Sequence, residues 1–218
     1  MNEKRSSGRD SAIRRRLVAQ FERPHGWLGR LAAWTMAHRE SNQRRNLWTI
    51  DLLDVAPNHR VLDVGCGPGF AVAALAERLS NGQVVGLDHS RVALDQARRR
   101  NRRSVTTGRV VLILGSYTAL PELGAPFDRM MAVNSLMFSG ETEEVLSALR
   151  RRLKPDGMLA VTSQSRAAHA DDEGSDRMAD RIAAGLMASG FDVVARDVLS
   201  MQPASAVCIR ARPARGAR

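Results

Sequence analysis

Three glycines at intervals of two residues follow a short apolar run in the segment VLDVGCGPGF, residues 61–70. They are Gly65, Gly67 and Gly69, and an acidic residue, Asp63, precedes them. Glycine has no Cβ, so it accepts a positive φ and lets the main chain approach a ligand closely. The segment therefore predicts a turn at which a small molecule lies against the backbone.

The spacing of these glycines differs from two common phosphate-binding loops. The dinucleotide fingerprint G-x-G-x-x-G would need glycine at position 70, where the chain has Phe70. The G-x-x-x-x-G-K-[ST] loop is absent as well, because no lysine follows the glycines. The loop offers backbone approach without a cation, and phosphate is not the ligand that it favours.

A second acidic residue, Asp88, ends the apolar run QVVGLD, residues 83–88. An acid at the end of the second strand of a nucleotide-binding sheet accepts hydrogen bonds from ribose hydroxyls. Together with Asp63 beside the loop, Asp88 predicts a ligand with a ribose, no required phosphate and a partner for a carboxylate. S-adenosylmethionine fits this description, because it has a ribose, an ammonium, a carboxylate and a positively charged sulfur.

These motifs lie in a regular alternation of predicted strands and helices. Strands are expected at residues 60–64, 83–88, 109–114, 127–135, 158–164, 191–200 and 204–212, and helices at 70–80, 91–103, 141–153 and 175–189. The alternation predicts an α/β sandwich with a seven-stranded, mostly parallel sheet and helices on both faces. The link between the last two strands is too short for a crossover helix, so this hairpin should be antiparallel.

The N-terminal quarter has a different character, with helical periodicity and all three tryptophans. We expect a mobile basic arm over residues 1–19, a helical cap or lid over 20–56, the cofactor-binding domain over 57–212 and a disordered tail over 213–218. Within the domain, the segment Lys154-Pro155-Asp156-Gly157 is expected to stop the helix that precedes it.

Composition limits the class of protein and its partners. The 218 residues suffice for one well-buried domain, and no apolar run approaches the ~20 residues of a bilayer span. The N-terminus has no apolar stretch behind its charges, so no secretory signal is expected. Cys66 and Cys208 lie far apart without metal-ligand spacing, which predicts reduced thiols in a cytoplasmic protein and no metal site.

The formal net charge of +10 invites an interpretation as a nucleic-acid-binding protein. Arginines cluster at residues 14–16, 98–103 and 150–152. With one tyrosine and five phenylalanines, however, the chain has few residues for base stacking, and it lacks a known RNA-binding motif. Solvated helix faces are therefore favoured over a polyanion contact, which stays open.

The segments VLDVGCGPGF, GLDHS, FDRMMAVNS and LKPDGMLAVTS resemble the successive motifs of class I S-adenosylmethionine-dependent methyltransferases. The chain most resembles the small bacterial members that are similar to the ubiquinone/menaquinone C-methyltransferases, over roughly residues 58–212. The resemblance implies a Rossmann-like methyltransferase fold with an N-terminal helical lid. It also implies S-adenosyl-L-methionine as cofactor and S-adenosyl-L-homocysteine as product.

The resemblance further implies which residues bind the cofactor. Asp63 would orient the loop and the methionine ammonium, Asp88 would hold both ribose hydroxyls, and His89 would lie against the adenine or ribose. Asn134, at the end of the fourth strand, would face the sulfonium. The full predicted set is Asp63, Gly65, Cys66, Gly67, Pro68, Gly69, Asp88, His89, Ser116, Tyr117 and Asn134.

The chain departs from the family pattern after its third strand. The family often has Gly-Asp-Ala there, and this chain has Gly115-Ser116-Tyr117. The serine hydroxyl is a weaker partner for the adenine amino group than a carboxylate. Ser116 is therefore expected to contribute less than the family's aspartate, with Tyr117 as a packing partner.

The acceptor is expected to be small and apolar or lipid-like. The Asn-Pro-Pro-Tyr or Asp-Pro-Pro-Tyr signature of amino-methylating members is missing, and an apolar Met137-Phe138 pair follows the fourth strand instead. The residues predicted to face the acceptor are Trp27, Leu28, Leu31, Trp34, Met137 and Phe138. The alternative for the tryptophans is packing on the sheet, which is favoured for Trp48.

No catalytic residue is assigned. The sulfonium is already a good leaving group, so the protein must mainly align the reactants for in-line displacement. A base, if the acceptor carries a proton, would come from His25, His38, His89, His169 or an acid near the mouth of the site. Two other interpretations stay open: an RNA or other polyanion methyltransferase, and a catalytically silent cofactor-binding protein. A homodimer stays open as a partner of the chain.

Overall fold

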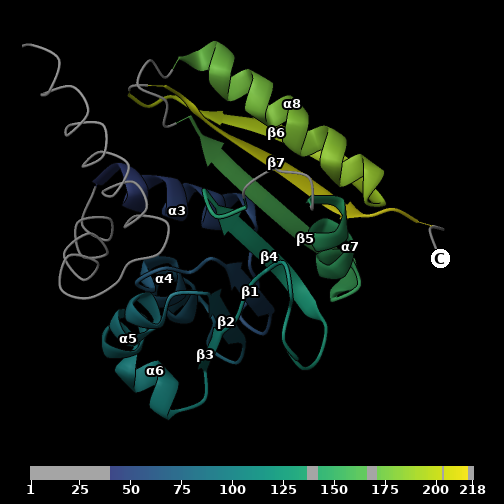
Figure 1. Ribbon diagram of the computed structural model, residues 1–218. Helices are drawn as coiled ribbons and strands as arrows, with labels where there is room; N and C mark the ends of the chain where they lie inside the picture. Colours follow the sequence, from purple (N-terminus) through teal and green to yellow (C-terminus); the bar gives the residue numbers. More distant parts are fainter. Residues whose placement is uncertain (1–39, 137–141, 166–170, 203, 216–218) are drawn as a thin grey trace, which may run out of the picture.

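A seven-stranded sheet runs through the protein in the order β3-β2-β1-β4-β5-β7-β6 (Figure 1). The computed structural model describes residues 40–136, 142–165, 171–202 and 204–215. The strands are β1 Arg60–Val64, β2 Gln83–Asp88, β3 Val110–Leu114, β4 Phe127–Val133, β5 Leu153–Gln164, β6 Phe191–Leu199 and β7 Ala206–Pro213. All pairs from β3 to β5 are parallel, and β7 is antiparallel to both β5 and β6. The predicted mostly parallel sheet with an antiparallel last hairpin is confirmed.

Helices cover both faces of this sheet. They are α3 Glu40–Leu52, α4 Phe70–Arg78, α5 Arg91–Arg100, α6 Arg102–Thr106, α7 Thr142–Arg150 and α8 Asp172–Ala188. Residues of α3, α4 and α5 form one buried apolar cluster with the sheet, and residues of α7 and α8 form a second cluster with its other face. This is the expected sandwich of a Rossmann-like fold.

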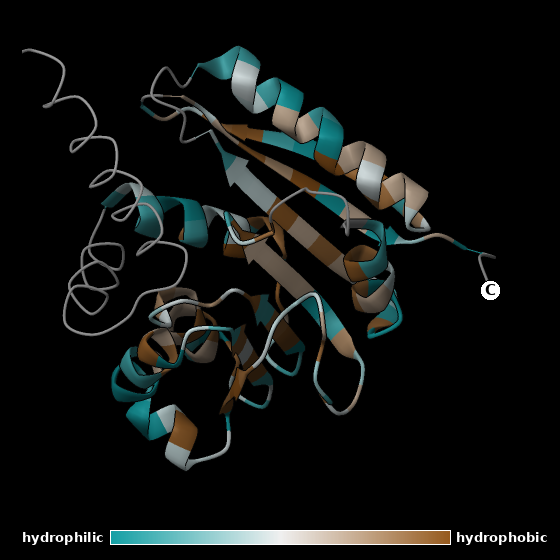
Figure 2. Cartoon of the chain, in the orientation of Figure 1, coloured by the Kyte–Doolittle hydropathy of each residue, from teal (hydrophilic) through white to brown (hydrophobic). Residues whose placement is uncertain are grey.

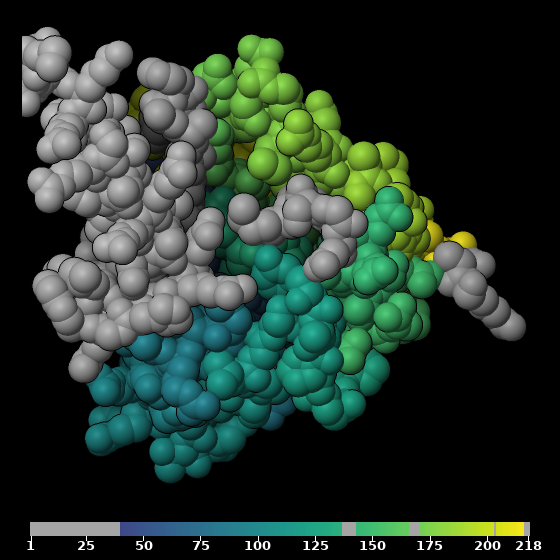
Figure 3. All heavy atoms as spheres, viewed as in Figure 1, coloured from purple at the N-terminus to yellow at the C-terminus, as the bar shows by residue number. Residues whose placement is uncertain are grey.

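The central strands are apolar because both of their faces are covered. Every residue of β1 and β2 after the first is buried, which is typical of parallel strands between two helical layers. Figure 2 shows hydrophobic residues along the strands and hydrophilic ones on the outer surfaces of α5 and α8. In the space-filling view, the teal half of the chain and the green-to-yellow half lie at opposite sides of the molecule (Figure 3).

The side of the sheet to which the chain adds its next strand changes between β1 and β4. After β1 the chain adds β2 and β3 on one side, then crosses to β4 on the other side. In open α/β sheets, ligands bind outside the carboxyl ends of the strands at such a switch point. The glycine loop after β1 and the turn after β4 both lie there, so the fold brings two of the predicted motifs together.

The sequence predicted that the segment Lys154–Gly157 separates a helix from a strand, and this prediction is wrong. The helix α7 already ends at Arg150, and β5 begins at Leu153. The pairing with β4 shifts from Phe127↔Leu153 to Arg129↔Met158, so the segment lies at an irregularity of the ladder. The Nζ atom of Lys154 donates to Asp128 Oδ1 at 2.6 Å, and this bond holds the segment against β4.

The predicted helix over residues 91–103 is divided into α5 and α6 at Asn101. The Asn101 carboxamide donates to the carbonyl oxygens of Ala97 and of Gly69, at 2.9 Å and 3.0 Å. The residue at the break, Asn101, therefore joins the end of α5 to the glycine loop.

The predicted cap is described only in its second half. There Ile50 of α3 and Leu53, the residue after this helix, are fully buried in the core, and Trp48 packs against the same cluster, as was favoured for this tryptophan. The predicted arm, the rest of the cap and its residues Trp27, Leu28, Leu31 and Trp34 lie outside the described residues. The domain boundaries stay predictions. None of the helices in the described ranges is long and apolar enough for a membrane span.

Candidate functional site

The glycine loop has the left-handed backbone that its sequence predicts. Gly65, Gly67 and Gly69 have φ values of 74°, 53° and 76°. The backbone N–H groups of Gly65 and Cys66 both donate to Leu87 O, at 2.8 Å and 3.0 Å. These bonds tie the loop to the end of β2, so the ends of the first two strands form one unit.

The three glycines differ in what surrounds them. A Cβ on Gly65 would lie 2.3 Å from Ser135 Cβ, and one on Gly69 would lie 2.7 Å from Ala97 Cβ. A Cβ on Gly67 would meet no atom within 4 Å. Packing within the protein thus requires glycine at 65 and 69, whereas Gly67 is the position where the backbone borders open space. The sequence had attributed all three glycines to the approach of a ligand.

Asp88 holds the glycine loop from the end of β2. Its Oδ2 accepts from the backbone N–H of Gly67 and its Oδ1 from that of Ser90, both at 2.8 Å. The side chain is buried, and α5 begins directly after Ser90. Each carboxylate oxygen can accept a further hydrogen bond, so these contacts leave capacity for the ribose hydroxyls.

Asp63 is a buried carboxyl group in which one oxygen lacks a hydrogen-bond donor in the described part of the chain. It is 3% exposed, and its Oδ2 has no hydrogen-bond partner among the described residues. Burial, and then the charge of Asp88, raise the pKa of Asp63 to about 7. A buried carboxylate is costly unless a cation or a donor compensates it. Asp63 is therefore prepared to receive a positively charged donor.

Cys66, beside these two acids, is a neutral thiol. Burial, and then Asp63 and Asp88, raise its pKa well above the ordinary value. Since only the thiolate is a nucleophile or a metal ligand, Cys66 contributes packing rather than chemistry. Within the described ranges, no group of three histidine, cysteine or acidic residues is placed to hold a metal.

The turn after β4 forms the other side of the site. Asn134 has a φ of 52°, and its backbone N–H donates to Thr162 O at 2.9 Å. Its Oδ1 accepts from the backbone N–H of Gln164 at 2.8 Å, while its Nδ2 is buried without a partner in the described structure. The next residue, Ser135, donates from Oγ to Val64 O. The turn is thus joined to both β5 and β1.

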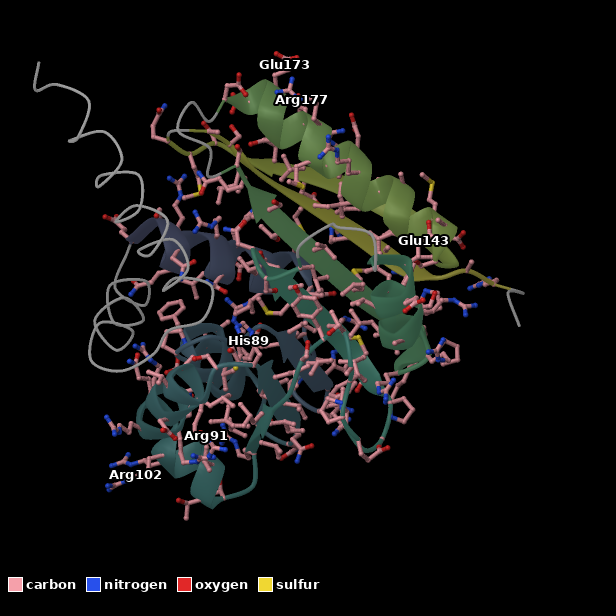
Figure 4. All side chains as sticks on the ribbon, viewed as in Figure 1. His89, Arg91, Arg102, Glu143, Glu173 and Arg177 are labelled. Carbon is pink, nitrogen blue, oxygen red and sulfur yellow. The ribbon has the colours of Figure 1, made fainter. Side chains whose placement is uncertain are left out.

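The remaining predicted residues lie after β2 and β3. His89 follows Asp88, and its side chain is 45% exposed, with Nδ1 3.9 Å from Asp88 Oδ1 (Figure 4). The Ser116 hydroxyl bonds to Thr118 Oγ1 at 2.8 Å and accepts from Thr118 N at 3.2 Å, so it is engaged within its own turn. Tyr117 is partly buried and packs against the core cluster, and its contact with the adenine stays a prediction.

The structure therefore gathers Asp63, the glycine loop, Asp88 and Asn134 at one edge of the sheet. Met137 and Phe138 lie outside the described residues, so the predicted acceptor side cannot be placed. Sequence reasoning missed Ser135 and Gln164, which hold the turn after β4. Ser135 adjoins a predicted site residue, whereas nothing local to Gln164 indicates its contact.

The donor set fits S-adenosylmethionine. The unpartnered Oδ2 of Asp63 suits an ammonium, and the open space at Gly67 admits a chain of atoms against the backbone. Asp88 retains acceptor capacity for a ribose diol. These three demands match the methionine and ribose parts of that molecule.

Comparison with known proteins gives the same result. A family model described as "Methyltransferase domain" matches residues 56–188. The chain is 30% identical over 182 residues to the uncharacterized methyltransferase YdaC of Bacillus subtilis, covering 84% of this chain and 97% of that protein. It is 31% identical over 122 residues to 24-methylenesterol C-methyltransferase 2 of Oryza sativa, covering 56% of this chain and 33% of that enzyme.

Among solved structures, the [4+2]-cyclase SpnF has a similar fold. Its TM-score is 0.66 at 21% sequence identity, and the match covers 82% of this chain and 84% of that one. At this identity the likeness concerns the fold alone.

Proposed function

The chain belongs to the S-adenosylmethionine-dependent methyltransferases, and we propose that it methylates a small, apolar or lipid-like metabolite by in-line displacement. The cofactor supplies a methyl group on a sulfonium, which leaves as neutral S-adenosyl-L-homocysteine. The protein must then bind, align and dehydrate the reactants. Alignment alone accounts for about 7–11 kcal/mol of barrier in favourable cases.

The unpartnered carboxylate oxygen of Asp63 is the observation that carries the cofactor side of this proposal. In the proposed complex Asp63 holds the ammonium, and the backbone at Gly67 lies along the methionine chain. Asp88 keeps the loop in place through its bond to Gly67 N and accepts from the ribose hydroxyls. Cys66 stays a neutral thiol at the same edge and takes no part in the transfer.

Two features support an apolar acceptor. The turn after β4 continues into Leu136, which packs against the core cluster, and then into Met137 and Phe138. The rice relative named above is by its name a sterol methyltransferase, and a sterol is a largely apolar acceptor. We assign no catalytic base, and a proton released by the acceptor would pass to solvent or to a group not yet identified.

Labelled cofactor tests the acceptor class. The full chain is incubated with S-adenosylmethionine carrying a tritiated methyl group and with fractions of a lysate from the source cell. The proposal expects label in organic-extractable metabolites. Label in RNA would favour the polyanion interpretation, and tight cofactor binding without any labelled product would favour a silent protein.

Trp27→Ala tests the predicted lid over the acceptor. If Trp27 faces the acceptor, this variant loses acceptor affinity or turnover while its cofactor affinity is unchanged. Trp48→Ala is the matched control, because Trp48 packs against the core on α3. Unchanged turnover and acceptor affinity in Trp27→Ala would remove the lid from the proposal.

One observation favours the polyanion alternative. The helices α5 and α6 expose six arginines with one acidic residue, Asp95, between them. Figure 4 labels two of these arginines, Arg91 on α5 and Arg102 on α6. The arginines are Arg91, Arg98, Arg99, Arg100, Arg102 and Arg103. Binding of bulk tRNA that weakens steeply between 50 mM and 200 mM salt, about 10³-fold or more for six phosphate contacts, would support it. Weak, salt-insensitive binding would leave these arginines as a solvated surface.

A further inference from the structure

The carboxamide of Asn134 has a fixed orientation. A backbone N–H can only donate, so the atom that faces Gln164 N at 2.8 Å is the oxygen Oδ1. The backbone of Asn134 is held as well, by the bond from its N–H to Thr162 O and by its φ of 52°. Nδ2 must therefore point away from β5, and it is the atom without a partner in the described residues.

A buried polar relay maintains this orientation. Gln164 is 8% exposed, its Oε1 accepts from Arg45 Nη1 of α3, and its Nε2 donates to Ala204 O at 2.6 Å. A second contact joins the same helix and strand, between Thr49 Oγ1 and Thr162 Oγ1 at 2.7 Å. Helix α3 and the segment at Ala204 thus fix Gln164, and Gln164 fixes Asn134.

The donor lies at the switch point of the sheet. Ser135, the next residue, donates to Val64 O, and its Cβ lies where a side chain on Gly65 would be. Asn134 is therefore one residue from the contact between the turn after β4 and the glycine loop. A buried N–H without an acceptor is unfavourable, and a ligand oxygen at this edge would compensate it.

We propose that Nδ2 of Asn134 donates to an oxygen of the methyl acceptor, carried on or next to the atom that receives the methyl group. The acceptor is then an apolar molecule with a hydroxyl or carbonyl oxygen, rather than a pure hydrocarbon. This inference rests on the proposed function, because it specifies the acceptor of that reaction.

The chemistry at this position favours the acceptor over the cofactor. In the proposed complex Asn134 faces the sulfonium, and an N–H donor is repelled by a positive charge and needs an oxygen nearby. The ammonium of the cofactor is served by Asp63. Two carboxyl groups, Asp63 and Asp88, lie at the same edge, which favours a neutral oxygen over a further carboxylate.

The proposed contact is compatible with the transfer. A hydroxyl oxygen accepts from Asn134 with one lone pair and keeps the other for attack on the methyl carbon. The new bond to that carbon forms as its bond to sulfur breaks, and the proton of the hydroxyl passes to solvent. With a carbonyl, the neighbouring carbon loses a proton to solvent and attacks the methyl carbon as the enolate, and Asn134 donates to the enolate oxygen. A neighbouring nitrogen attacks in the same way and loses its proton to solvent.

A matched pair of probes tests the inference. Heptanophenone has a carbonyl oxygen that only accepts, and heptylbenzene has a methylene group in its place. Their dissociation constants are measured for the full chain loaded with S-adenosyl-L-homocysteine, by isothermal titration calorimetry. In the same samples, ¹⁵N NMR follows the Asn134 side-chain amide signal, identified by its absence from Asn134→Asp.

The informative variant is Asn134→Asp. Aspartate tolerates the positive φ and still accepts from Gln164 N, so the donor is lost, but a third carboxyl group is added near Asp63 and Asp88. Asn134→Gly suits the same backbone and has no side chain, so it removes the donor without adding a charge and is the second variant. Asn81→Asp makes the same chemical change at an exposed turn and is the control.

The inference expects heptanophenone to bind about tenfold tighter than heptylbenzene in the wild type and in Asn81→Asp. The Asn134 amide signal should shift with the ketone alone, and both Asn134 variants should lose the preference. Equal binding of the two probes to the wild type would overturn the inference and leave the apolar acceptor standing.

Two other outcomes would overturn it. Binding of neither probe to the loaded protein would refute the apolar acceptor of the proposed function and this inference with it. A tenfold loss of S-adenosyl-L-homocysteine affinity in Asn134→Asp, without such a loss in Asn81→Asp, would assign the donor to the cofactor instead.

Discussion

Asp63 on β1 and Asn134, which directly follows the neighbouring strand β4, lie at the switch point of the sheet, and each keeps one buried polar atom without a partner in the described structure. In the β1–β4 register Asp63 is opposite Met131, so Asn134 lies further toward the carboxyl edge. Their demands are opposite, because Oδ2 of Asp63 needs a donor and Nδ2 of Asn134 needs an acceptor. A site with one unpaired acceptor and one unpaired donor suits a ligand that has both a hydrogen-bond donor and a hydrogen-bond acceptor.

Asp63→Asn should stabilise the cofactor-free protein in a pH-dependent way. The pKa of Asp63 is about 7 in the folded chain, against 3.8 as the ordinary value. Between these values the folded chain keeps a proton that the unfolded chain has lost, so wild-type stability falls as the pH rises. The advantage of Asp63→Asn should grow by about 1.4 kcal/mol per pH unit and level off above pH 7, at about 4 kcal/mol or less.

Urea denaturation of both proteins at pH 5, 6, 7 and 8 measures this difference. Asp192→Asn, an exposed acid on β6, is the control and should show no such trend. An advantage of Asp63→Asn that is equal at pH 5 and pH 8 would contradict the raised pKa.

Cofactor binding should release a proton from Asp63. The ammonium favours the ionised carboxylate, so the pKa of Asp63 falls in the complex. Below pH 7 the proton must leave on binding, and affinity for S-adenosylmethionine should rise with pH and level off above about 7. Calorimetry at pH 6 in two buffers with different ionisation enthalpies should detect up to about one proton released. Release of the same size in Asp63→Asn would assign the proton to another group.

Substitutions of the loop glycines should distinguish an effect on the free energy of unfolding from an effect on cofactor affinity. Gly69→Ala would place a Cβ 2.9 Å from the backbone Cα of Ala97, so it should lower the free energy of unfolding by about 1–3 kcal/mol or more. Gly67→Ala meets no atom of the protein and should cost mainly the strain of its positive φ, about 1–2 kcal/mol. It should nevertheless weaken cofactor binding at least tenfold, because its Cβ occupies the open space.

Gly108→Ala is the matched control for that experiment. Gly108 has a φ of 74° and no atom within 4 Å of an added Cβ, but it lies between α6 and β3, away from the loop. It should lose a similar amount of stability as Gly67→Ala and keep wild-type affinity. Equal affinities for Gly67→Ala and Gly108→Ala would show that no ligand passes over Gly67.

The sequence predicted those parts of the fold that are encoded locally. The runs RVLDV and QVVGLD are apolar and end at glycine or acidic residues, and they became β1 and β2 with the same bounds. The prediction that Lys154–Gly157 stops a helix was wrong because proline and glycine disrupt both helices and strand pairing. Only the register with β4 shows that they interrupt a ladder rather than end a helix.

The site was predictable where a motif carries it and not where distant residues meet. Asp63, the glycines and Asp88 lie within 30 residues, and their positions follow from strand ends. The bond of Gln164 to Asn134 spans 30 residues and that to Arg45 spans 119. No local pattern marks such contacts, because they follow from the order of the strands in the sheet.

Asp88→Ala should impair both the loop and the cofactor. It removes the acceptor for the part-buried N–H of Gly67 and for the buried N–H of Ser90. Leaving a buried donor such as Ser90 N unsatisfied costs about 1–3 kcal/mol, and the ribose loses its charged acceptor. The dissociation constant for S-adenosylmethionine should rise at least severalfold, measured by calorimetry on samples shown to be folded by circular dichroism. Asp95→Ala, which removes an exposed acid of α5, should bind as the wild type does. A folded Asp88→Ala protein with unchanged affinity would mean that the ribose does not lie at the end of β2.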